Sequence, residues 1–233
     1  MSDTLVNALI LIPCLIVAIV THEVAHGWVA LKLGDTTARD LNRLSLNPLR
    51  HVDPVGTLLV PGVLALSGGP VFGWAKPVPV RMDRLDNPRF GMMAVGAAGP
   101  AVNILLALLG AVVLGLIVRV AVAGGLDSPT EASDLVMQGL ATFLSINVFL
   151  ALFNLLPIPP FDGSHIVQGL LPERLGAAYG RLQRYGMVVF ALLVAVTWLA
   201  PELGLIESIV GGPFNWVMEQ LMTLAAFVAG ERT

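Results

Sequence analysis

Residues 5–31, LVNALILIPCLIVAIVTHEVAHGWVAL, form an apolar run that is long enough to cross a lipid bilayer as one helix. The run lacks the basic start and the small-residue cleavage site of a signal peptide, so we expect it to remain in the mature protein. Its second half nevertheless carries three ionisable side chains, His22, Glu23 and His26. Because ionisable groups are costly inside a bilayer and usually mark function there, the run indicates both a fold class and a candidate site.

The composition of the whole chain is typical of a polytopic membrane protein. Hydrophobic residues make up 56% of the 233 residues and charged residues only 12%, with a mean hydropathy of +0.82. The net charge of -3, without a basic tail or a phosphate-binding glycine loop, argues against nucleic acid and nucleotide partners. Cys14 is the single cysteine, so no disulfide can form within the chain and its expected role is packing.

Apolar runs along the chain predict five transmembrane helices, at residues 5–31, 91–123, 135–156, 187–200 with part of their flanks, and 213–230. A shorter apolar run, residues 55–66, is interrupted by Pro61 and Gly62 and predicts a re-entrant segment. We therefore expect an all-α polytopic membrane protein with about five transmembrane helices, a re-entrant segment and a short β-like edge segment.

The distribution of charges predicts how these spans are oriented, because cytoplasmic loops collect Lys and Arg. Basic residues flank segment 55–66 on both sides and follow the span 135–156. The segments that follow residues 123 and 200 carry acidic residues and neither Lys nor Arg. This pattern predicts an N terminus outside the cell and a C-terminal tail, after residue 230, inside it.

The ionisable residues of the first run have the spacing of an HExxH motif. Positions i and i+4 of a helix share one face, so His22 and His26 can bind one metal ion while Glu23 handles the proton of a water molecule. The competing interpretation is a pair of histidines that form hydrogen bonds between packed helices. With Lys32 at the cytoplasmic boundary, the motif lies inside the membrane towards the cytoplasm, and water has to reach it through a protein-lined cavity.

A catalytic zinc ion needs a third protein ligand and an open position for water. The favoured candidate is Asp162 in FNLLPIPPFDGSH, because it follows the span 135–156 on the same side of the membrane as the histidines. The prolines before it interrupt the helix, and the glycine after it permits a turn. The alternative third ligands are His51, Asp53 and His165.

Three motifs, in this order, resemble those of the site-2 protease family of intramembrane zinc metalloproteases: HEVAH at 22–26, GPAVN at 99–103 and FNLLPIPPFDG at 153–163. NPLRHVDPVGTL and GWAKPVPV are similar to stretches of the compact bacterial members, which have no PDZ domain. The resemblance implies a bacterial cell-membrane protein. We expect a catalytic membrane core over residues 1–172 and further transmembrane helices of the same membrane domain over residues 173–233.

The resemblance also implies roles for individual residues. His22, His26 and Asp162 are the expected ligands of one Zn²⁺ ion, and Glu23 is the expected general base. Asn154 is expected to hold the substrate and stabilise the oxyanion, with a helix–helix hydrogen bond as the alternative. The expected substrate is a transmembrane protein or peptide whose helix unwinds locally before it is cut on the cytoplasmic side.

The stretch GWAKPVPVRM is the expected edge segment, because Pro77 and Pro79 are compatible with an edge strand but not with a central one. Its free face could pair with an extended substrate, so Val78 and Val80 are candidate substrate-binding residues. Trp74 is a further candidate, although tryptophans in membrane proteins are more often interface anchors.

Three further polar residues keep two interpretations each. Asn103 either packs between helices or contacts the substrate or the site. His51 and His165 are either ordinary surface histidines or auxiliary groups that gate water or bind the metal in a resting state.

A metal transporter or channel is the main alternative function, because the same His and Asp residues could line a permeation path. A transporter requires two related halves or ligands that reach both membrane faces, and the sequence contains no internal repeat. Glu23 distinguishes the two functions, since only a protease needs a proton-transferring carboxylate between the two histidines.

Overall fold

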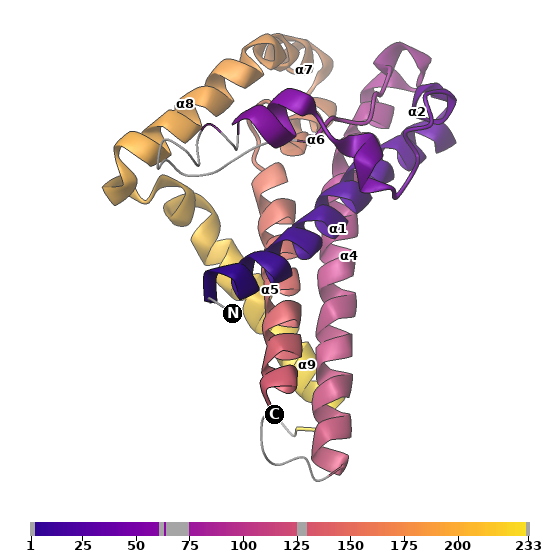
Figure 1. The fold of residues 1–233 in the computed structure, drawn as a ribbon. Helices are drawn as coiled ribbons and strands as arrows, with labels where there is room; N and C mark the ends of the chain where they lie inside the picture. The colour runs from indigo at the N-terminus through magenta and orange to yellow at the C-terminus, as the bar shows by residue number, and fades with distance from the viewer. Residues whose placement is uncertain (1–2, 61–62, 64–74, 125–129, 232–233) are drawn as a thin grey trace.

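The computed structural model describes residues 3–60, 63, 75–124 and 130–231. Over these residues the chain is helical and contains no strand (Figure 1). Its α-helices are α1 (Asp3–Lys32), α2 (Thr37–Asp40), α4 (Pro88–Ala123), α5 (Glu131–Asn154), α6 (Asp162–Leu170), α7 (Glu173–Gly180), α8 (Gly186–Leu199) and α9 (Gly212–Ala229). Short 3₁₀ or π turns are η1 (Pro48–His51), η2 (Pro54–Leu59), η3 (Met82–Arg84), η4 (Arg181–Tyr185), η5 (Pro201–Leu203) and η6 (Glu207–Gly211).

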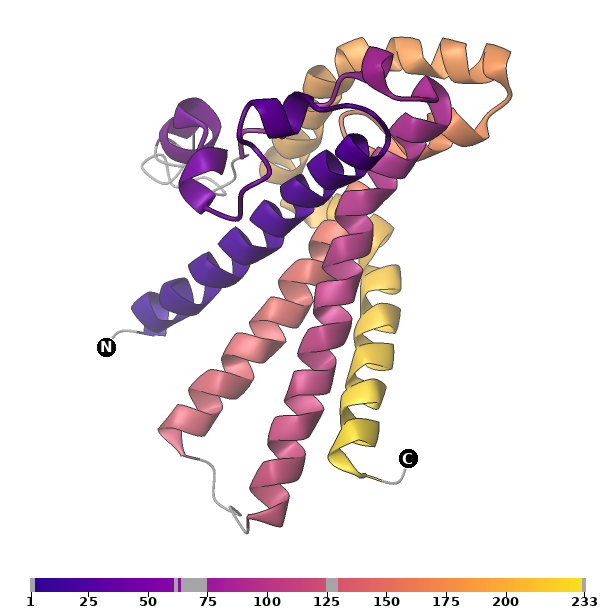
Figure 2. The same ribbon diagram turned by 90° about the vertical axis from the view of Figure 1, so that its right-hand side faces the viewer.

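Helix α4 lies at the centre of the molecule, where it packs against α1, α5, α6 and α9 (Figures 1 and 2). Small residues on α4 permit this close packing. A Cβ atom at Gly110 would lie 3.3 Å from Phe143 of α5, and one at Gly115 would collide with the carbonyl oxygen of Ala225 in α9. Small residues are the usual means by which membrane helices approach each other closely, since apolar burial gives little advantage over lipid.

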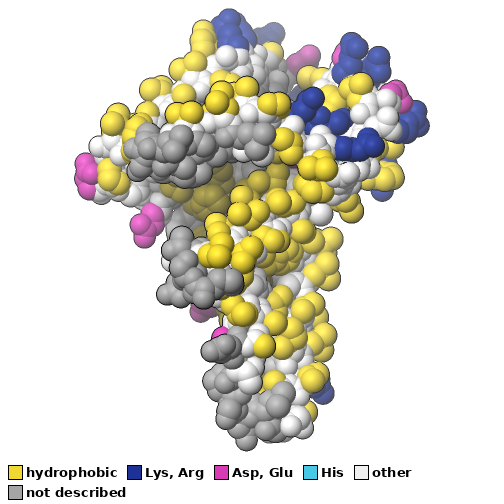
Figure 3. Space-filling model, viewed as in Figure 1, with side chains coloured by type: hydrophobic (Ala, Val, Ile, Leu, Met, Phe, Trp, Pro, Cys, Tyr) yellow, Lys and Arg dark blue, Asp and Glu magenta, His cyan; other side chains and the backbone are white. Residues whose placement is uncertain are grey.

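Within the described residues, four stretches are long and apolar enough to cross a membrane: Leu5–Lys32, Pro88–Ala123, Ala132–Asn154 and Glu173–Leu199. Hydrophobic side chains cover much of the surface below the top of the molecule in the view of Figure 3, as expected where lipid is the solvent. The prediction of a polytopic helical protein is confirmed. The predicted fifth span is not among the four, because α9 carries Asn215, Glu219 and Gln220, which lower its mean hydropathy.

The C-terminal end of α9 lies at the same end of the molecule as the end of α4 and the start of α5 (Figures 1 and 2). Most Lys and Arg side chains in view gather at the opposite end (Figure 3). The helix that precedes the predicted cytoplasmic tail therefore ends away from most basic side chains, and the side of the membrane that the tail faces stays a prediction. In Figure 1, α8 runs from the top of the molecule down to the left, and α9 then runs down to the right towards the opposite end.

The predicted β-like edge segment is also corrected. Residues 75–81 have no regular secondary structure, and their backbone groups bond to side chains and loops instead of a neighbouring strand. The predicted re-entrant segment, residues 55–66, begins with the turn η2 (Pro54–Leu59), whose first N–H groups are capped by Asp53. Most of the remainder of that segment and Trp74 lie outside the described residues.

Candidate metal centre

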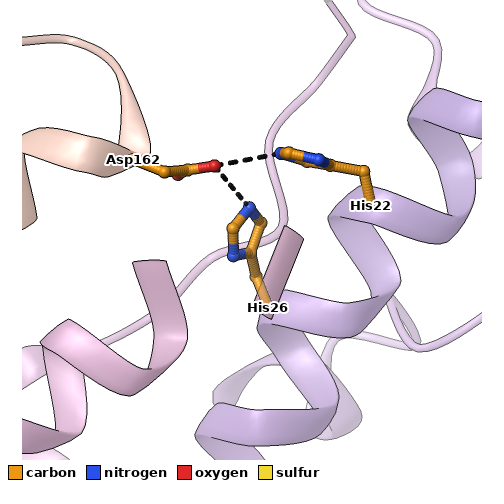
Figure 4. Close-up of side chains that lie close together, drawn as sticks. All are labelled: His22, His26 and Asp162. Atoms are coloured by element: carbon orange, nitrogen blue, oxygen red, sulfur yellow. Dashed lines mark ion pairs between the residues drawn. The ribbon is translucent and has the colours of Figure 1, made fainter. Parts of the chain in front are cut away.

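The two histidines of α1 and the aspartate that begins α6 converge on one point (Figure 4). The Nε2 atom of His22 lies 3.1 Å from Oδ2 of Asp162, and Nε2 of His26 lies 3.3 Å from the same oxygen. Both histidines are buried. The i, i+4 spacing on one helix face therefore brings both imidazoles to a single carboxylate supplied by a distant part of the chain.

The proline-rich turn between α5 and α6 positions Asp162. This turn ends at Phe161, which is buried and packs with its ring 4.6 Å from that of Phe153 in α5. A Cβ atom at Gly163 would collide with the carbonyl oxygen of Leu155, so only glycine allows α6 to begin so close to the end of α5. The turn thus delivers the carboxylate to the histidines from a fixed direction.

Hydrogen bonds on the far side of each imidazole leave the Nε2 lone pairs free to bind a metal. Nδ1 of His26 lies 2.7 Å from the carbonyl oxygen of Val95 in α4. Because a carbonyl can only accept, Nδ1 carries the hydrogen and Nε2 keeps its lone pair. Nδ1 of His22 lies 2.6 Å from Oδ1 of Asn103 in α4. The amide nitrogen of Asn103 donates to the carbonyl oxygen of Ala18 at 3.2 Å, which fixes Oδ1 as the acceptor for His22.

A second buried amide extends this network. Nδ2 of Asn103 also donates to Oδ1 of Asn147 in α5, at 2.8 Å, and Nδ2 of Asn147 donates to the carbonyl oxygen of Phe143. Both asparagines have no exposed surface. Asn103 thus contacts His22 and also joins α4 to α1 and α5, and its role at the site stays a prediction. Asn147 was not predicted, although its only sequence signal, an amide within an apolar span, was present.

The three side chains fit a divalent metal ion. Two imidazole lone pairs that face a carboxylate oxygen repel it unless a cation lies between them. Ligand atoms around a tetrahedral zinc ion lie about 3.3 Å apart, given bond lengths of about 2.0–2.1 Å. Within the described part of the structure, Oδ2 of Asp162 is buried and has no hydrogen-bond partner. A Cβ atom at Gly99 of α4 would lie within 2.5–2.6 Å of both Nε2 atoms, so glycine keeps this space open.

The side chain of Glu23 is half-buried and lies beside the cluster on α1. Its Oε2 atom accepts a hydrogen bond of 2.8 Å from the backbone N–H of Val78. Val78 is buried, so this N–H faces the interior rather than a free edge. Among the described residues, no hydrogen bond to the other carboxylate oxygen of Glu23 is found, so that oxygen can take part in proton transfer.

The other predicted residues lie outside the His22–His26–Asp162 cluster. Asn154 is the last residue of α5, and its amide nitrogen donates to the carbonyl oxygen of Leu150 in the same helix at 2.9 Å. Its role at the substrate stays a prediction. Within the described residues, the side chains close enough together to share a metal ion are those of His22, His26 and Asp162. The alternative third ligands His51, Asp53 and His165 are not part of this group.

His51 and His165 are more buried than a surface residue would be. Nε2 of His51 donates to the carbonyl oxygen of Ser45 at 2.7 Å, which ties the loop after α2 together. His165 packs against Gly96 of α4, where an added Cβ atom would lie 3.1 Å from its own Cβ. Burial lowers the pKa of His165, although the nearby Asp162 acts in the opposite direction.

Comparison with known proteins agrees with this geometry. The profile of peptidase family M50 matches residues 10–197. The chain is 39% identical over 183 residues to "Putative zinc metalloprotease YwhC" of Bacillus subtilis (strain 168), which covers 78% of each protein. It is 27% identical over 179 residues to "Putative zinc metalloprotease Rip2" of Mycolicibacterium smegmatis (strain ATCC 700084 / mc(2)155). That alignment covers 74% of this chain and 61% of the relative. No solved structure matches the chain.

The fold and the site define a helical membrane protein with a buried His–His–Asp cluster suited to a metal ion. Together with the match over residues 10–197, they establish the family: the chain belongs to peptidase family M50, the site-2 proteases. The predicted resemblance and the predicted enzyme class are thereby confirmed.

Proposed function

We propose that the protein is an intramembrane zinc metalloprotease that hydrolyses peptide bonds within or near transmembrane segments of membrane proteins. The observation that carries this proposal is the convergence of two imidazole lone pairs and an otherwise unpartnered carboxylate oxygen at one buried point. A bound zinc ion supplies Lewis-acid chemistry that activates water and polarises the scissile carbonyl. The catalytic membrane core comprises residues 1–172, and residues 173–233 form the C-terminal part of the same membrane domain.

In the proposed mechanism, the residues of the chain manage the protons and the substrate. Glu23 accepts the proton of the attacking water through its free oxygen and passes it to the leaving amine. Asn154 turns its amide towards the scissile carbonyl and stabilises the negative charge that develops there. The carbonyls of a substrate helix are engaged in i to i-4 hydrogen bonds, so the substrate has to unwind locally before Glu23 can act.

The proposed substrate is a transmembrane protein or peptide in the cell membrane of a bacterium, cut towards the cytoplasmic face. The basic residues gather at the end of the molecule from which α1 carries its histidines into the membrane, which supports that orientation. Family membership favours a peptidase over a metal transporter, and Glu23 has a role only in the former.

Purified wild type and Glu23→Gln, incubated with a panel of single-span membrane substrates, test the proposal. We expect equal zinc content and cleavage by wild type alone, because glutamine keeps the shape of glutamate but does not accept a proton. Removal of zinc with a chelator should stop cleavage, and added zinc should restore it. Zinc movement across vesicle membranes by both proteins, without cleavage, would instead support the transporter.

Val80 remains the better candidate for backbone pairing with the substrate, since the N–H of Val78 is engaged with Glu23. Val80→Pro removes the only N–H donor between Pro79 and Arg81. We expect this variant to keep its zinc and to cleave about tenfold more slowly, the effect of losing one positioning contact. Cleavage at the wild-type rate would exclude Val80 from substrate binding.

A further inference from the structure

Residues 75–81, proposed above as a substrate-pairing segment, also pack directly on the catalytic helix α1. Val78 is buried at the centre of this segment. A Cβ atom at Gly27 of α1 would lie 2.8 Å from Cγ1 of Val78, and Gly27 follows Glu23 by one helical turn. The absence of a side chain at Gly27 therefore allows the segment to approach the part of α1 that carries Glu23.

The N-terminal side of the segment is anchored by the loop that follows α2. Arg43 is buried, and its Nη2 atom donates to the carbonyl oxygens of Lys76 at 2.6 Å and Pro77 at 3.3 Å. The backbone N–H of Lys76 donates to the carbonyl oxygen of His51 at 2.8 Å. The single atom Nη2 serves both backbone carbonyls and so ties this end of the segment to Arg43, whereas the buried Nε of Arg43 has no hydrogen-bond partner among the described residues.

The C-terminal side of the segment is anchored by the loop at the end of α1. The backbone N–H of Arg81 donates to Oδ2 of Asp35 at 2.6 Å, and Asp35 has no exposed surface. Shortly afterwards the N–H of Asp86 donates to the carbonyl oxygen of Leu33 at 2.9 Å. The segment is therefore held at both ends by residues outside it.

Between these anchors, a single backbone donor points to the general base. Pro77 and Pro79 have no N–H group, so Val78 supplies the only amide hydrogen of residues 77–79. That hydrogen is donated to Oε2 of Glu23 at 2.8 Å. A glutamate side chain that makes no such contact samples several rotamers, whereas this hydrogen bond restricts it and leaves the second oxygen free.

We propose that residues 75–81 form a clamp that orients the Glu23 carboxylate, and that Arg43 is a positioning residue which acts through this clamp. Arg43 does not touch Glu23; it holds the carbonyls of Lys76 and Pro77, and these place the N–H of Val78. This proposal depends on the proposed function in one respect, the role of Glu23 as the general base. It assigns a purpose to Arg43 and to the Lys-Pro-Val-Pro-Val sequence.

Hydrogen–deuterium exchange tests the clamp without any measurement of activity. Within residues 77–79, only the backbone amide of Val78 can exchange, so deuterium uptake at these three positions measures that amide alone. We expect slow exchange at Val78 in the wild type and exchange about tenfold faster in Arg43→Met and Glu23→Ala, because each loses a contact that protects it. Arg50→Met is the matched control, since Arg50 is exposed and donates to the carbonyl oxygen of Asn42 instead. Fast exchange in the wild type, or no change in Arg43→Met, would overturn the proposal.

Cleavage kinetics with a single-span substrate then distinguish a role of Arg43 in positioning Glu23 from a role in the stability of the fold. We expect Arg43→Met to bind zinc like the wild type and to lower kcat about tenfold, with KM changed less than about twofold. Arg43→Lys keeps the positive charge and one donor nitrogen, so its kcat should fall between those of the wild type and Arg43→Met. In a Glu23→Asp background, whose shorter side chain does not reach the clamp, Arg43→Met should change kcat less than about twofold.

Equal effects of Arg43→Met in both backgrounds, or an effect on KM alone, would refute a role through Glu23. If the wild type shows no zinc-dependent cleavage, the proposed function fails, and the exchange experiment still decides whether the clamp exists.

Discussion

Gly99 shows how a single missing side chain can determine whether the metal centre forms. Its α4 position faces both imidazoles, and an added Cβ atom would lie 2.5 Å from Nε2 of His22 and 2.6 Å from Nε2 of His26. We predict that Gly99→Ala lowers zinc affinity by at least about 100-fold, more than the loss of one supporting hydrogen bond costs. Zinc content after dialysis against a chelator measures this. Gly139→Ala on α5 is the control, because an added Cβ atom there would meet no described neighbour within 4 Å, and equal zinc retention by both variants would contradict the prediction.

Asn103 is expected to control zinc affinity through His22. Asn103→Leu removes the acceptor for Nδ1 of His22, so the imidazole loses the bond that fixes its tautomer and orientation. We predict an affinity about 10–100-fold lower, measured by competition with a chromogenic chelator. Asn103→Asp keeps an acceptor and should retain more affinity than Asn103→Leu. The same affinity in both variants would show that the hydrogen bond to His22 is not the cause.

His22 and His26 could be predicted from their i, i+4 spacing, and Asp162 from its place after a proline-rich turn on the same side of the membrane; the three form a cluster consistent with a zinc site. The role of Glu23 stays a prediction. The supports of the two histidines were not predicted to the same extent. The acceptor for His26 is the backbone carbonyl of Val95, and every residue offers a carbonyl, so no sequence pattern marks it.

At the scale of single elements, Asp35 links the end of α1 to segment 75–81. Its carboxylate accepts hydrogen bonds from the N–H of Arg81 and from the N–H and hydroxyl of Thr37. Burial acts to raise the pKa of Asp35, but these hydrogen bonds outweigh it and hold the pKa below its ordinary value. The segment is therefore attached by a group that stays ionised at neutral pH.

This shift predicts how stability depends on pH. A carboxyl whose pKa is lower in the folded state than the unfolded value of about 3.9 stabilises the fold above that pH. The contribution falls as the pH decreases from about 4 through the folded-state pKa. The difference in melting temperature between wild type and Asp35→Asn should thus be large at neutral pH and shrink below about pH 4. A difference that stays constant across this range would rule out Asp35 as the titrating group.

Segment 75–81 also explains why an edge strand was expected but is not present. Alternating valines and prolines favour extended backbone, which is a correct local inference. A strand further requires a ladder of backbone partners, and here the partners are a guanidinium, two carboxylates and a loop carbonyl. Those partners come from residues far away in the sequence, so local pattern could not reveal them.

At the scale of the whole molecule, hydropathy identified the membrane class and four of the spans, because the bilayer imposes length and apolarity on each helix separately. The predicted fifth span, α9, is not among these four because of its polar residues, and its position in the molecule depends on packing. Gly115 of α4 and Ala225 of α9 bring the two backbones together, and this contact is independent of how apolar α9 is. Such contacts between helices decide the path of the chain after α8.

The position of α9 leads to a prediction about membrane topology. Its C-terminal end lies opposite the end where most basic side chains gather, so residue 231 and residue 50 should face different sides of the membrane. In a Cys14→Ala background, Glu231→Cys and Arg50→Cys can be labelled with a membrane-impermeant maleimide. We expect Arg50→Cys to react in inside-out vesicles and Glu231→Cys in intact spheroplasts, because cytoplasmic loops collect basic residues. Labelling of both residues from the same side would contradict this prediction.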